Sequence, residues 1–183
     1  MRTLPDEADR YAVAKEVLSQ IPHPVVIIGA AAGGERSCAT GTAMYVSFSP
    51  AILAVALHPG SRTAKLIERS GELSLSVLTQ AQQDLAFAAG RSAPTGDDKF
   101  TALRIPVLEP PDGATAPAVA NSIAVIWCRV TDRVPVGDHI LHIAEVIAHR
   151  NDPTKLDALL RFKRRYVNIG HWTSEESPEG YPT

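Results

Sequence analysis

Six consecutive residues, His58-Pro59-Gly60-Ser61-Arg62-Thr63, bring together side chains that suit an anion. The very apolar run Ile52 to Leu57 leads into this turn, and helical spacing of apolar residues begins directly after it. A helix start leaves backbone N–H groups without carbonyl partners, and its dipole favours negative charge. Ser61 and Thr63 add hydroxyl donors, and Arg62 adds a guanidinium capable of bidentate contacts. The segment predicts a phosphate site, although an ordinary helix cap with a solvated arginine gives the same pattern.

The stretch Gly41 to Phe48 precedes this turn and begins with small residues. Slim side chains allow a planar ring to approach the backbone closely, and strand N–H groups can then bond ring carbonyls and nitrogens. The alternative is an ordinary strand with Met44 in the core. Taken together, the two stretches predict a wall and a phosphate cradle for a flat, phosphorylated cofactor.

The other candidates for chemistry are a histidine and two cysteines. His139 follows Gly137-Asp138 at a turn into a strand, where a histidine usually faces solvent or caps the turn, but it could also position a substrate or supply a proton. Cys38 and Cys128 lack a C-x-x-C partner, so we expect free, partly buried thiols. No His, Cys or carboxylate cluster has zinc-like spacing, and we therefore predict no metal site.

Size and charge restrict the class of protein. The 183 residues predict one domain, 1–183, with a core over about 22–170 and a loose tail at 174–183. A net charge of −2 argues against nucleic-acid binding. The sequence has no apolar run of membrane-spanning length, and its N-terminus lacks the apolar core of a signal peptide. We therefore expect a cytoplasmic protein without membrane or nucleic-acid partners.

Periodicity and turn residues predict a chain dominated by strands. Strands are expected at Pro24–Ala32, within 41–48, at Ile52–Leu57, Glu72–Leu78, Ser122–Val130 and His139–His149, and helices at Asp6–Gln20, Thr63–Ser70, Gln80–Ala89 and Asp152–Tyr166. Residues 106–117 are expected to form a surface excursion, and the basic run Arg161–Arg165 the solvated face of the last helix. This order favours an antiparallel Greek-key barrel with helices outside, and no G-x-G-x-x-G follows a strand.

Several short motifs, in this order and at this spacing, resemble the flavin reductase-like family over residues 22–170. The motifs are Tyr45-Val46-Ser47-Phe48-Ser49-Pro50, the apolar strand after it, Ser61-Arg62-Thr63, Leu66-Ile67, Ser70-Gly71, Leu75-Ser76-Val77-Leu78, Lys99-Phe100 and Gly137-Asp138-His139. The resemblance implies an FMN-binding split β-barrel, mainly β, with its flavin where the two subunits of a homodimer meet. It also implies an NAD(P)H:flavin reductase, an oxidoreductase that supplies reduced flavin to a monooxygenase component.

The resemblance also implies a role for each matching position. By similarity, the residues that line the isoalloxazine ring are Thr42, Ala43, Met44, Tyr45 and Val46. The residues that bind the phosphate are Ser61, Arg62 and Thr63, and the pair that borders the flavin is Lys99 and Phe100. The catalytic histidine near the reactive face is His139. The segment Arg164-Arg165-Tyr166 resembles one that family members use at the dimer and site entrance. Ala51 replaces the family's second proline, a departure that affects single ring contacts.

Two choices stay open at this point. The resemblance implies FMN, with FAD as the alternative, and it does not choose between NADH and NADPH as co-substrate. A different class of function also fits the same fold. Related split barrels bind flavin or haem as electron carriers and have no direct reaction with a nicotinamide.

Overall fold

The fold is known from a computed structural model, which describes residues 7–91 and 98–169. Its helices are α1 Glu7–Leu18, α2 Arg62–Ser70, α3 Gln83–Ala89 and α4 Lys99–Ala102, with the 3-10 turn η1 Gln80–Gln82 before α3. Its strands are β1 His23–Pro24, β2 Val26–Ala32, β3 Glu35–Gly41, β4 Ala43–Phe48, β5 Ala51–Leu57, β6 Glu72–Val77, β7 Val107–Leu108, β8 Ala118–Val119, β9 Ala124–Val136, β10 His139–Asn151, β11 Leu159–Phe162 and β12 Arg165–Asn168.

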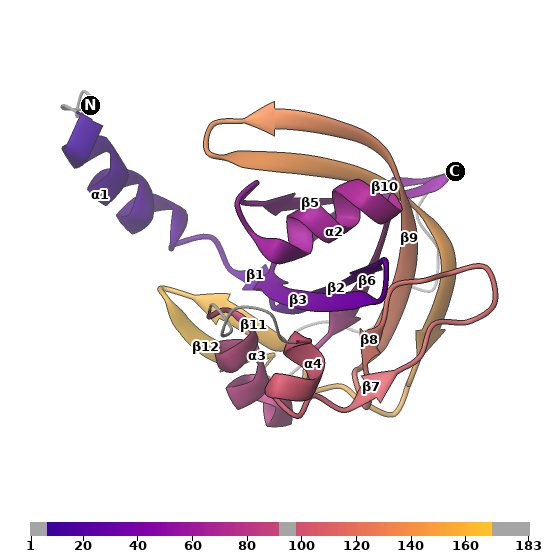
Figure 1. The fold of residues 1–183 in the computed structure, drawn as a ribbon. Coiled ribbons are helices and arrows are strands. Elements are labelled where there is room, and N and C mark those ends of the chain that lie inside the picture. Colours follow the sequence, from indigo (N-terminus) through magenta and orange to yellow (C-terminus); the bar gives the residue numbers. More distant parts are fainter. Residues whose placement is uncertain (1–6, 92–97, 170–183) are drawn as a thin grey trace.

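A seven-stranded antiparallel sheet in the order β3-β2-β6-β9-β10-β5-β4 dominates the molecule (Figure 1). A three-stranded sheet, β1-β11-β12, and the β7-β8 pair lie beside it. The mainly antiparallel β fold expected from the sequence is therefore confirmed. In the described part of the chain, no helix has the length and apolar character needed to cross a membrane.

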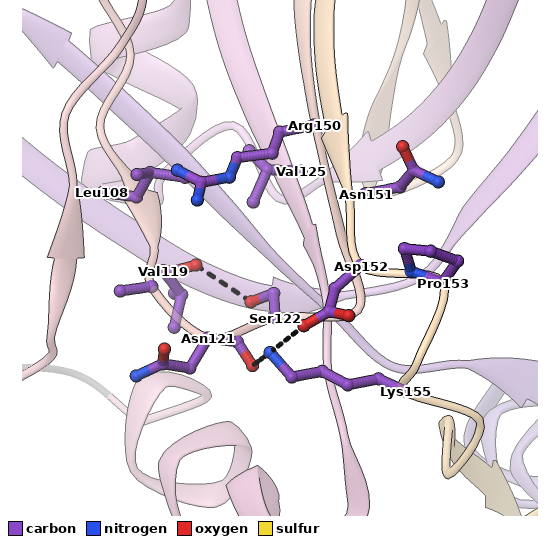
Figure 2. Close-up of a pocket in the computed structure, with 11 residues that line it drawn as sticks. Leu108, Val119, Asn121, Ser122, Val125, Arg150, Asn151, Asp152, Pro153 and Lys155 are labelled. Carbon is purple, nitrogen blue, oxygen red and sulfur yellow. Dashed lines mark hydrogen bonds and ion pairs between the residues drawn. The ribbon is translucent and has the colours of Figure 1, made fainter.

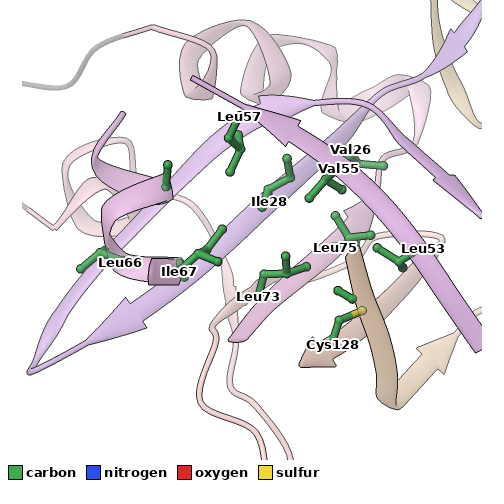
Figure 3. Packing of buried hydrophobic residues seen from close by; sticks show 13 residues of the cluster. Val26, Ile28, Leu53, Val55, Leu57, Leu66, Ile67, Leu73, Leu75 and Cys128 are labelled. Carbon is green, nitrogen blue, oxygen red and sulfur yellow. The ribbon is translucent and has the colours of Figure 1, made fainter. Parts of the chain in front are cut away.

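The large sheet curves around one apolar core (Figure 3). Val26 and Ile28 of β2 share this core with Leu53 and Val55 of β5, although β6, β9 and β10 lie between these two strands in the sheet order. Only a curved sheet brings such strands into one cluster. Ile67 of α2 joins the same cluster, so the amphipathic helix covers the core with its apolar side. The two edge strands, β3 and β4, are consecutive in sequence.

Strand β2 is buried on both faces, as its continuous apolar run predicts. Val25 and Ile27 pack into a second cluster with Cys38 and Phe100, on the side away from α2. Burial raises the pKa of Cys38 and of Cys128 to about 12, and both thiols are free. The expected free, buried thiols are confirmed.

Gly29 of β2 allows the excursion over residues 106–117 to pack back on the sheet. A Cβ at this position would lie 2.1 Å from the Pro117 carbonyl oxygen and 2.6 Å from Ser74 Oγ. The same carbonyl accepts a hydrogen bond from Ser74 Oγ at 2.7 Å, and Ser76 Oγ accepts one from the Val119 amide. This hydrogen bond holds the Pro117 carbonyl oxygen in place against the backbone of Gly29.

We expect Gly29→Ala to lower the free energy of unfolding by about 2–3 kcal/mol, because the added methyl overpacks a rigid backbone contact. Urea denaturation measures the change. Gly90→Ala is the matched control: its φ is −74°, and its Cβ would approach no atom closer than 3.5 Å. The control should stay within about 0.5 kcal/mol of the wild type. Equal losses in both variants would contradict the packing argument.

Besides the short elements α4, β1, β7 and β8, two elements differ from the sequence prediction, and the larger difference is the last helix. Residues 152–166 form a turn and the β11–β12 hairpin instead, with Lys163 and Arg164 in the left-handed region at φ 48° and 65°. Asp152 accepts bonds from the Thr154 amide and hydroxyl in a local turn, so it caps no helix. Tertiary pairing decides the outcome, because β11 pairs with both β1 and β12. The basic run is therefore part of a hairpin.

The smaller difference is β3, which the sequence analysis did not predict as a strand. This run of small polar residues pairs with β2 along its whole length, from Val26 with Gly41 to Ala32 with Glu35. From Ser37 onward its side chains are small, and α2, α3 and α4 all pack against it. The residue composition of this segment therefore gave no strand signal, and the strand is stabilised by its pairing and packing.

His142 of β10 is a buried imidazole whose Nδ1 has no hydrogen-bond partner among the described residues. Burial, and secondarily the charge of Arg133, lower its pKa below the ordinary histidine value of about 6.5. The folded state therefore resists protonation at a pH where the unfolded state accepts it. The stability linked to this group is highest above about pH 6.5 and falls as pH drops toward the folded pKa.

We expect the wild type to lose more stability than His142→Leu when pH falls from about 7.5 to about 5.5, because only the wild type titrates this group on unfolding. Urea denaturation at both pH values gives the two differences, and the exposed histidines contribute equally to each protein. The same pH dependence in both proteins would show that His142 does not cause it.

Candidate functional site

The pairing of β5 with β10 brings His58 and His139 together. Leu57 lies opposite Ile140 in this antiparallel pair, so the residue after Leu57 lies beside the residue before Ile140. The two imidazole rings meet edge to face, with centroids 6.1 Å apart. His139 Nδ1 lies 2.8 Å from Asp138 Oδ1, and this contact is the main cause that lowers the pKa of Asp138. The turn before β10 thus lies beside the start of α2.

Hydrogen bonds hold the turn between β5 and α2 in one shape. The Ser61 amide donates to the His58 carbonyl at 3.0 Å, and the Gly60 amide donates to His58 Nδ1 at 3.0 Å. Because Nδ1 accepts this bond, the proton of a neutral His58 is on Nε2, which can donate outward. Ser61 is the N-cap and accepts a bond from the Ala64 amide, as predicted. The other N–H groups of the first turn have no partner within the helix.

Side chains at the start of α2 interact with β3. Thr63 Oγ1 lies 3.1 Å from Ser37 Oγ, and both groups are buried between the helix and the strand. Arg62 forms an ion pair with Glu35 at 3.1 Å, and Arg69 binds the other carboxylate oxygen at 2.8 Å. These bonds, Arg69 first, lower the pKa of Glu35. An anion at the helix start would therefore compete with Glu35 for the Arg62 guanidinium.

Strand β4 is the edge of the large sheet and its first residues lie at the same end as the start of α2. Ala43 pairs with Val55 and Met44 with Ala54, so β4 begins beside the last residues of β5. The apolar side chains of Met44, Tyr45, Val46 and Phe48 are all more than half exposed. The alternative that Met44 belongs to the core is therefore wrong. Among the described strands, nothing pairs with the outer edge of β4.

Lys99 and Phe100 lie on the other side of β3 from α2. Phe100 packs in the second core cluster with Cys38, whereas the neighbouring Ser37 faces Thr63. Successive residues of a strand point to opposite faces, which explains the separation. Lys99 is buried, and its Nζ donates to the Ala89 carbonyl at the end of α3 at 2.6 Å. The structure thus does not bring this pair to the face that carries Ser61 to Thr63.

The structure collects most of the predicted site residues at one end of β5 and adds three that sequence reasoning had not assigned: His58, Glu35 and Ser37. Each of the three acts on a predicted residue from a distant part of the chain. His58 lies within the turn that was singled out, but only the pairing of β5 with β10 shows its contact with His139. A sequence signal for Glu35 and Ser37 was missing, because β3 itself was not predicted.

Comparisons with known proteins agree with this geometry. The sequence profile described as "Flavin reductase like domain" matches residues 18–170. The chain is 27% identical over 168 residues to the NADH:riboflavin 5'-phosphate oxidoreductase of Streptomyces pristinaespiralis, covering 88% of this chain and 92% of the relative.

Solved structures show the same fold. The NADH:FAD oxidoreductase SgcE6 of Streptomyces globisporus superposes with a TM-score of 0.82 at 21% identity, covering 93% of this chain and 99% of the other. A nitrilotriacetate monooxygenase component B homologue from Mycobacterium thermoresistibile gives 0.81 at 24% identity, with 96% and 98% covered.

Proposed function

The chain belongs to the flavin reductase-like family, and on this premise we propose that it is an NAD(P)H-dependent flavin reductase. The relative from Streptomyces pristinaespiralis is named for NADH and riboflavin 5'-phosphate, which supports FMN and NADH as the reactants, with FAD and NADPH as alternatives. The observation that carries the proposal is the meeting of the α2 start, the edge strand β4 and the His58–His139 pair at one end of β5.

The donors present fit a flavin phosphate. Backbone N–H groups of the first helical turn, the Ser61 hydroxyl and the Arg62 guanidinium together favour a phosphoryl group. In this proposal Thr42 to Val46 line the ring, and the edge of β4 with which no described strand pairs supplies N–H groups to its polar rim. Thr63 orients the helix through Ser37, and Lys99 and Phe100 support β3 from behind.

A flavin bound at this site would supply the hydride acceptor, its N5 atom, for a reduced nicotinamide. The residues contribute binding and orientation. Asp138 holds the His139 ring through Nδ1, which leaves Nε2 directed outward to position the nicotinamide or supply a proton. His58 supports the same ring from its edge. Such orientation matters because hydride transfer requires the reacting atoms within about 3–3.5 Å.

Steady-state oxidation of NADH and NADPH, followed by loss of their absorbance with and without added FMN, tests the proposal. The expected result is oxidation that depends on FMN and on the protein. Oxidation at the background rate with both nicotinamides would overturn it and would favour an electron carrier. The spectrum of cofactor released from the purified protein separates FMN from FAD and from haem.

The proposal includes a homodimer with the flavin near its interface. The exposed apolar side chains of β4, which is an edge strand among the described residues, offer a surface that a second copy would cover. Light scattering should give about twice the chain mass of 19.6 kDa. Phe48→Glu, which places a charge in that surface, should shift the mass toward one chain. A wild type that binds FMN with the mass of one chain would contradict this part.

The partner and the compartment are also part of the proposal. A structural relative that is a monooxygenase component B supports delivery of reduced flavin to a monooxygenase component. A cytoplasmic location agrees with Cys38 and Cys128, which are both free thiols.

A further inference from the structure

A second cavity lies at the end of β10 opposite His139 (Figure 2). It has a volume of about 290 Å³ and is enclosed by β7, β8, the start of β9, the end of β10 and the turn that follows. His139 and Arg150 stand near opposite ends of a thirteen-residue strand, which separates them by roughly 35 Å along the chain. The cavity is therefore not part of the flavin site.

On one side of this cavity, the charged side chains of Lys155 and Asp152 pair with each other. Lys155 Nζ lies 3.0 Å from Asp152 Oδ2 and donates to the Asn121 carbonyl at 3.1 Å. Asp152 also accepts bonds from the amide and hydroxyl of Thr154, and these contacts, the hydroxyl first, lower its pKa to about 2. The cation and the carboxylate neutralise each other, so this side adds no net charge that would repel or attract an ion.

The other side carries an arginine that lacks such a partner. Figure 2 shows the Arg150 side chain extending toward Leu108, across the cavity from Asn121 and Lys155. Neither a hydrogen bond nor an ion pair joins its guanidinium to any of residues 7–91 or 98–169. The net charge that the cavity presents is therefore positive. A guanidinium beside a concave surface binds carboxylates well, because its planar fork matches both carboxylate oxygens.

Apolar side chains provide part of the remaining surface, beside the side chains of Asn121 and Asn151. Leu108, Val119 and Val125 line the cavity, and Ser122 Oγ is occupied by a bond to the Val119 carbonyl. The volume lies at the lower end of the range for small-molecule sites, so a single ring fits better than a dinucleotide. We propose that this cavity binds a small organic anion, a carboxylate on one apolar ring, with the carboxylate on Arg150 and the ring against the partly exposed Leu108.

Titration of the full-length protein with sodium benzoate, followed by two-dimensional amide NMR in the presence and absence of FMN, tests this proposal. We expect saturable shifts in the amides of residues 108, 121, 125, 150–152, 154 and 155, with a Kd of the order of 1 mM that FMN does not change. Arg150→Gln should weaken binding about tenfold or more, because a charge-assisted contact is lost. Arg91→Gln removes an exposed arginine elsewhere and should leave benzoate binding unchanged.

Benzamide tests the same contact without a mutation, because it keeps the ring and lacks the charge. Benzamide should bind the wild type about tenfold more weakly than benzoate does. It should bind Arg150→Gln as weakly as it binds the wild type. The proposal is overturned if benzoate moves none of the lining amides, if the shifts do not saturate, or if Arg150→Gln binds benzoate as the wild type does. The spread of amide signals shows directly whether each variant is folded.

Discussion

Arg62→Ala is expected to weaken FMN binding by about 10- to 100-fold and to leave riboflavin binding nearly unchanged. FMN carries the phosphate and riboflavin does not, so only FMN loses the contact at the start of α2. The guanidinium already pairs with Glu35, which holds it beside the first turn of the helix. Fluorescence titration of both flavins, under anaerobic conditions without nicotinamide, measures the two affinities.

Arg69→Ala is the matched control for this prediction. Arg69 binds the same Glu35 carboxylate but stands in the last turn of α2, away from the predicted phosphate site. An exposed ion pair contributes little energy, so the control should change FMN affinity by less than about fivefold. Equal losses for FMN and riboflavin in Arg62→Ala, or equal losses in both variants, would count against the phosphate cradle.

The second large effect is expected at His139. His139→Ala should slow reduction of bound flavin by about 100-fold, whereas the flavin Kd should change by only a few fold, because the ring acts on the nicotinamide side. Anaerobic stopped-flow mixing of the flavin-loaded protein with NADH isolates this single turnover. The pairing with Asp138 and the contact with His58 support this expectation, since both restrict the ring.

Two further variants separate chemistry from strand stability. His149→Ala removes an exposed histidine from the other end of β10 and should reduce flavin at the wild-type rate. Asp138→Asn keeps the side-chain size but removes the charge that orients His139, so its rate should fall between those of the wild type and His139→Ala. An unchanged single-turnover rate in His139→Ala would remove this residue from the site.

Features that depend on a few neighbouring residues were predictable from the sequence. The helix predicted over Thr63–Ser70 is confirmed as α2. Ser61 caps its start, and Gly71 ends it in a left-handed conformation with its amide bonded to the Ile67 carbonyl. The burial of β2 is also confirmed, because a continuous apolar run predicts a strand that is buried on both faces. The order of such motifs was also enough to identify the family.

The failed helix at 152–166 shows the limit of local patterns. Its apolar spacing suits a helix and a hairpin about equally, and Asp152 with Pro153 suits a helix start and a turn alike. The strand partner β1 decides between them, and that partner lies at the other end of the chain. Local propensity differs by less than the energy of pairing and burial, so the tertiary contact determines the structure.

The sequence by itself determined the mainly antiparallel β fold, the capped helix with its anion-binding residues, and membership of a flavin reductase family. Only the tertiary structure decided which distant residues meet: His58 with His139, Glu35 with Arg62, and Ser37 with Thr63. It also placed Lys99 and Phe100 behind β3 and opened the cavity at Arg150. The physical reason is that caps and turns are formed by adjacent residues, whereas a site is assembled by strand register and sheet curvature across the whole chain.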